Sequence, residues 1–161
     1  MDLLSLGTFD IIAISEPFIS DDGIPCVPSP YIQIVSPSFY GVALLVKHTL
    51  SVSEIAVSSD YIRAINVKLE NSHEITVVSF YMQTSRESIA MNDFKNFLSL
   101  HNQNVLICGD FNAHSAQTGY ATSDSLAKKF EELFEETGLC ILNTPGSVSY
   151  THLTLPTTPY V

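Results

Sequence analysis

An apolar strand expected at Asn104–Cys108 leads through a glycine into Asp110, Asn112 and His114. Side chains alternate between faces along an extended segment, so Asp110 and Asn112 should share one side while Phe111 packs in the core. A carboxylate can orient and deprotonate a water molecule, and an amide can donate to a developing negative charge. These groups therefore suit phosphodiester hydrolysis. The alternative is an Asx-type turn that merely ends a buried strand.

Glu16 ends a second apolar run, Phe9–Ser15, and is followed by Pro17. Proline cannot continue a strand ladder, so the carboxylate should stand at the strand terminus. An oxygen ligand in that position suits a hard divalent cation. The alternative is an ordinary exposed glutamate at a strand end.

Tyr81 and His114 could contact a substrate. Tyr81 ends the run Ile75–Phe80, and its hydroxyl could donate to a phosphate oxygen. The alternative is an ordinary half-buried strand tyrosine. His114 could hydrogen-bond a phosphate or orient Asp110, although a histidine in a loop is often simply solvated.

The composition limits both the size and the partners of the protein. With 161 residues the chain is long enough for one domain with a sizeable core. Hydrophobic residues make up 45% and charged residues 15%, which is typical of a globular protein. The formal net charge is -10, with seven Lys and Arg, so a broad basic face for nucleic acid is not expected. A divalent cation would have to lie between the carboxylates and a phosphate.

The cysteines and the apolar runs bear on the surroundings of the chain. Cys26, Cys108 and Cys140 are scattered and lack metal-type spacing, which favours a reduced, intracellular setting with Cys108 and Cys140 in the core. The opening residues 1–4 lack the basic start of a secretory signal. No apolar run reaches the roughly 18 residues that span a bilayer. We expect no membrane partner.

The elements that must position these groups follow from hydrophobic patterning. Apolar or alternating runs predict strands, and residues 18–38, with four prolines, predict a long loop. One strand, Tyr61–Leu69, alternates clearly enough to be half exposed, and it should form a hairpin with the strand that follows it. The expected strands are Phe9–Ser15, Tyr40–Lys47, Tyr61–Leu69, Ile75–Tyr81, Asn104–Cys108 and Leu139–Leu142.

Two segments have helical periodicity instead. Apolar residues share one helical face from Ala90 to His101 and again from Leu126 to Thr137. Asp124 or a neighbouring serine can cap the second helix, and Gly138 is placed to end it. Hairpin pairing mixed with helical crossovers implies sheet layers with helices packed outside.

Three motifs occur in a recognisable order: Ile14–Pro17, Ser79–Met82 and Cys108–His114, each at the end of an expected strand. Together they resemble the endonuclease/exonuclease/phosphatase superfamily, and most of all the apurinic-type endonuclease domain of non-LTR retrotransposons. The segments Tyr40–Val46 and Thr137–Gly146 support the likeness, which covers about residues 6–147.

The resemblance implies an α+β fold, namely a four-layer α/β/β/α sandwich of the deoxyribonuclease-like type with its site at the strand ends. It implies that Glu16 binds Mg²⁺ or Mn²⁺, that Tyr81 contacts the phosphate and that Asp110 activates the water. Asn112 would stabilise the transition state, and His114 would bind the substrate. The reaction would nick DNA in the nucleus and leave a 3′-hydroxyl, which the reverse transcriptase domain of the same polyprotein uses as a primer.

The chain also departs from this family pattern. No counterpart is present for a first strand with a metal-site Asn, nor for the closing strands that carry an Asp and an Asp-His pair. We therefore interpret residues 1–147 as a partial domain, incomplete at both ends. Residues 148–161 resemble the translation of a sequencing adaptor, so they are expected to be a non-native tail, and His152 is not assigned a catalytic role.

Two alternatives stay open. The same fold could act as a phosphoesterase on a lipid or inositol phosphate, although the Asn112–His114 string is more typical of retrotransposons. The chain could also be a catalytically inert fragment, because each missing catalytic group is worth roughly 10²–10⁴ in rate. By itself the 161-residue chain is expected to be weakly active or inactive.

Overall fold

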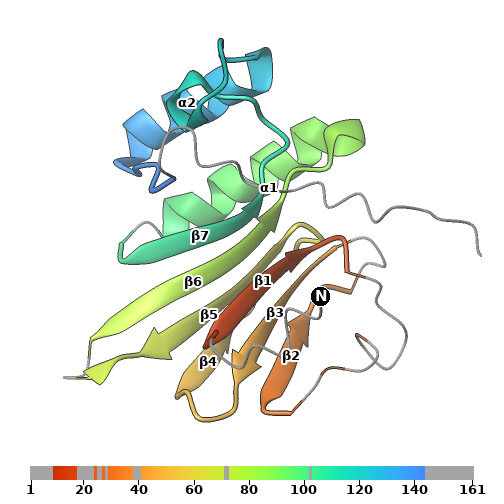
Figure 1. Cartoon of the computed structure of the whole chain (residues 1–161), viewed down its shortest axis with the longest axis vertical. Coiled ribbons are helices and arrows are strands. Elements are labelled where there is room, and N and C mark those ends of the chain that lie inside the picture. Colours follow the sequence, from red (N-terminus) through yellow and green to blue (C-terminus); the bar gives the residue numbers. More distant parts are fainter. Residues whose placement is uncertain are drawn as a thin grey trace, which may run out of the picture. The chain divides into compact units, whose positions relative to one another are not determined.

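The computed structural model describes residues 9–17, 24, 27, 29–37, 41–70, 73–101 and 103–143 (Figure 1). The chain forms two compact units, Met1–Asn112 and Ala113–Val161. The predicted non-native tail, residues 148–161, lies outside the described residues. The first unit contains β1 (Ile11–Ser15), β2 (Tyr31–Val35), β3 (Val42–Lys47), β4 (Val52–Ile55), β5 (Ile62–Lys68), β6 (Glu74–Tyr81), α1 (Glu87–Leu100) and β7 (Val105–Asp110), and the second contains α2 (Ser125–Thr137).

The described strands of the first unit form two sheets. One has the order β1-β3-β2 and is antiparallel throughout, and the other has the order β4-β5-β6-β7. In the second sheet β4, β5 and β6 pair antiparallel, whereas β6 and β7 are parallel. Parallel neighbours require a crossover connection, and α1 supplies it between β6 and β7. This mixture confirms the α+β class and the hairpin predicted between β5 and β6.

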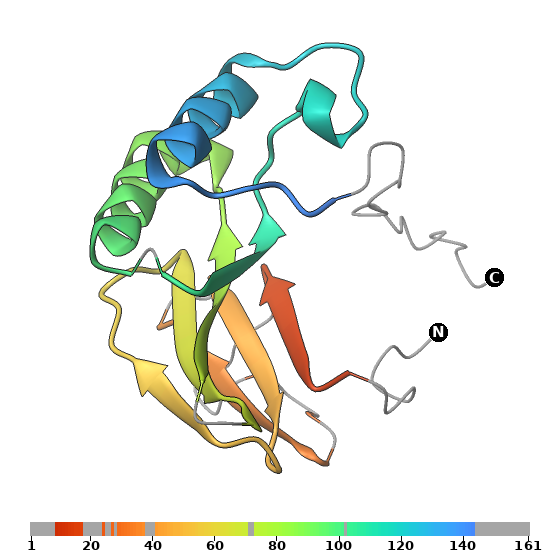
Figure 2. The same ribbon diagram turned by 90° about the vertical axis from the view of Figure 1, so that its left-hand side faces the viewer.

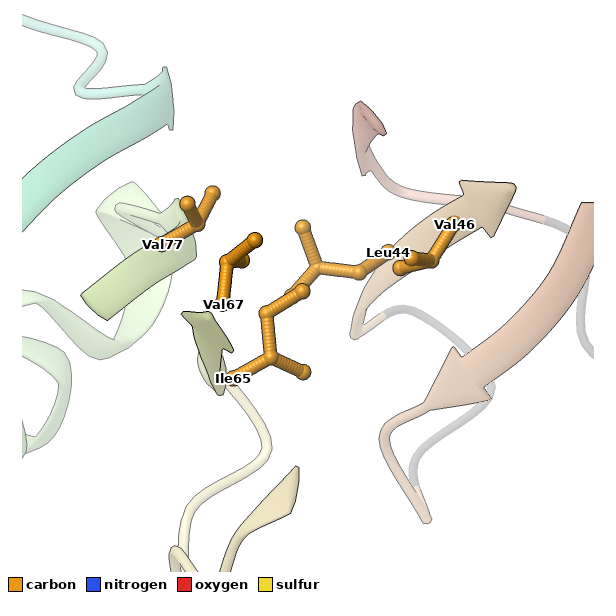
Figure 3. Packing of buried hydrophobic residues seen from close by; sticks show 5 residues of the cluster. All are labelled: Leu44, Val46, Ile65, Val67 and Val77. Atoms are coloured by element: carbon orange, nitrogen blue, oxygen red, sulfur yellow. The ribbon is translucent and has the colours of Figure 1, made fainter. Parts of the chain in front are cut away.

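The core of the first unit lies between the two sheets. Leu44 and Val46 of β3 face Ile65, Val67 and Val77 of the other sheet, and all five are buried (Figure 3). Residues two apart on a strand share a face, so the alternation within each strand directs these side chains inward.

Helix α1 covers the opposite face of the four-stranded sheet. The ring of Phe80 stacks on Phe94 of α1 with centroids 4.3 Å apart, and Phe80 lies an odd number of positions from the inward-facing Val77. Strand β5 is therefore buried on both faces, and Ile62, Ala64 and Ile65 are fully buried. The prediction of a half-exposed strand at Tyr61–Leu69 was wrong, because the helix covers the face that the sequence pattern assigned to water.

Helix α2 of the second unit begins and ends where the sequence predicts. The Asp124 side chain caps it by accepting a hydrogen bond from the N–H of Ala127, and Gly138 ends it in the left-handed conformation with φ 72°. Leu126, Phe130 and Leu133 form its buried face with Ala127. Since an αL residue at the C-cap satisfies the last carbonyl groups, glycine is favoured there.

Other segments also differ from the prediction. The loop predicted over residues 18–38 contains β2, and the polar strand β4 was not predicted. Residues Leu139–Leu142 form no strand, and both Cys140 and Leu142 are exposed. An apolar run of four residues does not specify a pairing partner, so the predictions of a strand and of a buried Cys140 were wrong. Within the described residues, no helix is both long and apolar enough to cross a membrane.

Candidate active site

Three strands of the first unit end at one place. β1 ends at Ser15, β6 at Tyr81 and β7 at Asp110, and both views show the tip of β1 beside the tips of β6 and β7 (Figures 1 and 2). β1 belongs to one sheet and β6 and β7 to the other. The predicted polar groups therefore gather where the edges of the two sheets meet.

The register of β6 and β7 sets Tyr81 beside Asp110. These two residues are Cα partners in the parallel pair, and partners in a parallel pair direct their side chains to the same face. The N–H of Met82 continues the pairing by donating to the carbonyl of Asp110 at 2.8 Å. The proximity of the phenol and the carboxylate follows from strand pairing alone.

Glu16 follows β1 in a left-handed backbone conformation with φ 51°. Its N–H donates to the carbonyl of Gly41 at 3.0 Å. Hydrogen bonding with its carboxylate is one of the causes that raise the pKa of Tyr81, although Glu16 as a whole is exposed. Non-glycine residues at positive φ are uncommon and occur often at functional sites.

The pKa of Tyr81 depends on both neighbouring carboxylates. Burial raises the pKa of Tyr81 well above its ordinary value of 10.0, and the hydrogen bond to Glu16 and the charges of Glu16 and Asp110 raise it further. Negative charge nearby disfavours the phenolate. The Tyr81 hydroxyl therefore remains a protonated donor, and the structure brings Glu16, Tyr81 and Asp110 together.

Asp110 and Asn112 form a tight turn at the end of β7. The Asp110 Oδ1 atom accepts a hydrogen bond from the N–H of Asn112 at 2.9 Å, which is the Asx-type turn that the sequence left open. Asn112 has φ 47°, so the strand-like alternation expected from Asp110 to Asn112 does not continue. Its Nδ2 instead donates to the carbonyl of Met82 at 2.9 Å. Phe111 packs against Phe80, with centroids 5.1 Å apart, as predicted.

Gly109 allows β7 to approach β6 closely. Its φ is 149°, and a Cβ atom added there would lie 1.8 Å from the carbonyl oxygen of Phe80. No side chain fits in that space, so only glycine can precede Asp110 at this spacing from β6.

His114 lies at the start of the second unit, Ala113–Val161, and contacts two neighbours within it. Its N–H donates to Asp124 Oδ2 at 3.0 Å, and its Nδ1 lies 3.3 Å from the same oxygen. Its ring packs against Tyr120 with centroids 4.5 Å apart. Backbone hydrogen bonds from Ala127 and His114 lower the pKa of the Asp124 carboxyl. The sequence identified Asp124 only as a helix cap and did not indicate its second contact.

The site offers two carboxylates, Glu16 and Asp110, that both face the Tyr81 hydroxyl. Mg²⁺ in proteins commonly binds one or two carboxylates and completes its octahedron with water and substrate phosphate. The described part of the chain holds no cluster of three or more His, Cys, Asp or Glu suited to a metal. The donor set therefore fits a hydrated Mg²⁺ or Mn²⁺ and does not fit a caged metal such as structural zinc.

A comparison with solved structures shows that the fold of the chain has a known counterpart. A solved structure, the "Endonuclease domain of TRAS1, a telomere-specific non-LTR retrotransposon", matches 86% of the chain with a TM-score of 0.74 and 21% sequence identity. The chain covers 64% of that domain. No curated protein sequence matches.

A family model described as endonuclease-reverse transcriptase matches residues 75–157. The match includes Tyr81, Asp110, Asn112 and His114, and it continues into the segment 148–161, whose non-native origin stays a prediction. Since the matched residues make up just over half of the chain, the protein belongs to the endonuclease-reverse transcriptase family.

Proposed function

We propose that the chain is part of a divalent-metal-dependent endonuclease that nicks DNA for target-primed reverse transcription of a non-LTR retrotransposon. The observation that carries the proposal is the meeting of the Glu16 carboxylate, the Tyr81 hydroxyl and the Asp110 carboxylate at three strand ends. Membership of the endonuclease-reverse transcriptase family supports the same reaction.

Each group has a role that its surroundings permit. Asp110 accepts the proton of the attacking water, with its Oδ1 held by the N–H of Asn112. Tyr81, kept protonated by its raised pKa, donates to a non-bridging phosphate oxygen. An amide nitrogen carries two N–H groups, so Asn112 can bond Met82 with one and donate to the transition state with the other.

The bonds that change are those of one phosphodiester. The oxygen of water bonds to phosphorus, the bond from phosphorus to O3′ breaks, and the leaving oxygen takes a proton to become the 3′-hydroxyl. Glu16 would hold Mg²⁺ or Mn²⁺, which when bound supplies Lewis-acid stabilisation of the phosphate charge. The cation would also offset the net charge of -10, which otherwise repels DNA.

The wider role follows from the family. We propose that the reverse transcriptase domain of the same polyprotein extends the 3′-hydroxyl and that this reaction takes place in the nucleus. His114 is proposed to contact the DNA, because its exposed ring is held by Asp124 and Tyr120.

Nicking of a supercoiled plasmid in Mg²⁺ tests the proposal. The assay compares this chain, a version extended at both ends from the native locus, and Asp110→Asn and Asp110→Ala in the extended version. Asparagine keeps a side-chain oxygen that can accept the hydrogen bond from the N–H of Asn112, whereas alanine does not. Comparing the two variants therefore separates the loss of the general base from the loss of the turn at Asp110. Asp10→Asn is the control, because Asp10 is exposed and pairs with Lys47 at the opposite end of β1.

The proposal is supported if nicking requires Mg²⁺ and stops when a chelator is added. The nicking rate should also fall by roughly 10²–10⁴-fold in both Asp110 variants. Phosphatase activity on lipid or inositol head groups without nicking would assign a different substrate to the same fold. Absence of both activities in every version, together with absence of metal binding, would show an inert fragment.

A further inference from the structure

Buried polar side chains in the first unit gather at the end that carries the candidate site. Among its described residues the buried polar or charged ones are Ser36, Arg63 and Ser79. Ser36 follows β2, and Arg63 and Ser79 are Cα partners on β5 and β6. Ser79 lies two positions before Tyr81 and therefore on the same face of β6. The interior between the sheets is apolar around Leu44 and Ile65 and becomes polar just below the site.

Two serines join the sheets within this polar layer. The Ser15 hydroxyl donates a hydrogen bond to the carbonyl oxygen of Phe80 at 3.5 Å. The same hydroxyl accepts a hydrogen bond from the N–H of Asp110 at 3.3 Å. The Ser79 hydroxyl lies 3.5 Å from the carbonyl oxygen of Ile14, to which it donates in return. These contacts link β1 to β6 and β7, which belong to the other sheet.

Arg63 joins the sheets at a neighbouring point. Its Nε donates to the carbonyl of Val35, at the end of β2, at 2.9 Å. Its NH1 donates to the carbonyls of Ser59 and Ile62 at 2.9 and 2.6 Å. Only 6% of Arg63 is exposed. The guanidinium therefore binds backbone carbonyls of the protein itself and not an external ligand.

We propose that Ser15 is a positioning residue of the site: its hydroxyl fastens the strand end that precedes Glu16 to the backbone of Asp110. The inference rests on the proposed function and adds a residue to it. Ser15 adjoins Glu16, and its Oγ accepts the N–H of Asp110 itself. The Ser15 side chain thus links the backbone of Asp110 to the residue that precedes Glu16.

Serine suits this position on geometric grounds. Ile11 and Ala13 of β1 pack against the inter-sheet core, and Ser15 continues the same face. A hydroxyl both donates and accepts, so one small group can serve Phe80 and Asp110 together. Alanine would keep the packing and lose both bonds, whereas threonine would keep the hydroxyl and is well tolerated in strands.

The test measures amide hydrogen exchange by NMR and Mn²⁺ affinity by calorimetry on this chain. In Ser15→Ala the Asp110 amide should exchange about tenfold faster and Mn²⁺ should bind about tenfold more weakly, as expected for the loss of a hydrogen bond. Ser15→Thr should restore both values. In the version that nicks DNA, Ser15→Ala should lower kcat and leave KM for the plasmid unchanged.

Two controls separate positioning from general loosening. Ser79→Ala removes the neighbouring bond to Ile14 but leaves the contact of Ser15 with Asp110, so Asp110 exchange should stay at the wild-type rate. Ser53→Ala changes an exposed serine on β4 and should alter nothing. Wild-type exchange and Mn²⁺ affinity in Ser15→Ala would overturn the inference and leave the proposed function standing. If neither the wild-type chain nor its extended version binds Mn²⁺, the proposed function falls, while Asp110 exchange still decides whether Ser15 ties the strands.

Discussion

The Tyr81 hydroxyl lies near enough to the Glu16 carboxylate for hydrogen bonding and charge to raise the pKa of Tyr81, although Tyr81 ends a strand of one sheet and Glu16 follows a strand of the other. Asp110 stands beside Tyr81 through the register of β6 and β7. The pKa of Tyr81 therefore depends on two carboxylates. We expect this arrangement to affect both the stability of the fold and the chemistry of the site.

Tyr81→Phe should reduce the loss of stability at alkaline pH. Because the pKa of Tyr81 is raised, the unfolded chain loses this proton near the ordinary value of 10.0 while the folded chain keeps it. The stability it contributes is fully present below about pH 10 and is lost as the pH rises through the folded pKa. Urea unfolding at about pH 8 and about pH 11 should show a smaller difference in the variant than in the wild type.

Tyr120→Phe is the matched control for that experiment. Tyr120 is exposed, and phenylalanine keeps its ring contact with His114. The control should lose as much stability at high pH as the wild type. An equally steep loss in Tyr81→Phe would show that folding does not raise the pKa of Tyr81.

Glu16→Gly should be more stable than Glu16→Ala by about 1 kcal/mol, because alanine pays a steric penalty in the left-handed region and glycine does not. Both variants lose the carboxylate and its bond to Tyr81, so their difference isolates the backbone at φ 51°. Urea unfolding measures the difference, and both variants should fail to nick DNA. Equal stabilities would argue that the backbone at residue 16 is not left-handed in solution.

Gly109→Ala should destabilise the chain by about 3 kcal/mol through overpacking. The new Cβ would lie 1.8 Å from the carbonyl oxygen of Phe80, so β7 must move away from β6. Gly138→Ala is the control: Gly138 also has a positive φ, of 72°, but a Cβ there meets nothing within 4 Å. It should cost only about 1 kcal/mol. Similar losses of unfolding free energy in both variants would contradict the close approach.

Sequence patterning predicted the elements whose apolar residues face a packed layer. Strands β1, β3, β5, β6 and β7 and helices α1 and α2 carry apolar runs or a helical face, and each was expected near its observed place. β4 was missed because Ser53 and Glu54 face solvent, which leaves no apolar run. β2 was missed because its short run lies among prolines, which were interpreted as a loop.

The sequence indicated which residues to compare at the candidate site, but it did not indicate how they are arranged in space. Strand ends carrying Glu16, Tyr81 and Asp110 indicated which groups to compare, and the structure places these three together. Which sheet holds each strand and how β6 registers with β7 depend on long-range pairing, which residue patterns do not specify. The left-handed conformations of Glu16 and Asn112 were not predicted either, because neither position carries glycine, the usual signal for positive φ.

Asn112→Gly should lower the nicking rate about 10²–10³-fold, since the amide that we propose as a donor to the transition state is lost. Glycine tolerates φ 47° and keeps the backbone N–H that holds Asp110 Oδ1, so Mn²⁺ affinity should stay at the wild-type value. Asn104→Gly is the matched control, because Asn104 also has a positive φ, of 50°, and precedes β7 at the end opposite Asp110. Plasmid nicking and calorimetry on both variants, in the version that nicks DNA, separate catalysis from binding. Loss of Mn²⁺ affinity in Asn112→Gly would assign Asn112 to the metal instead, and equal nicking rates in the two variants would remove it from the reaction.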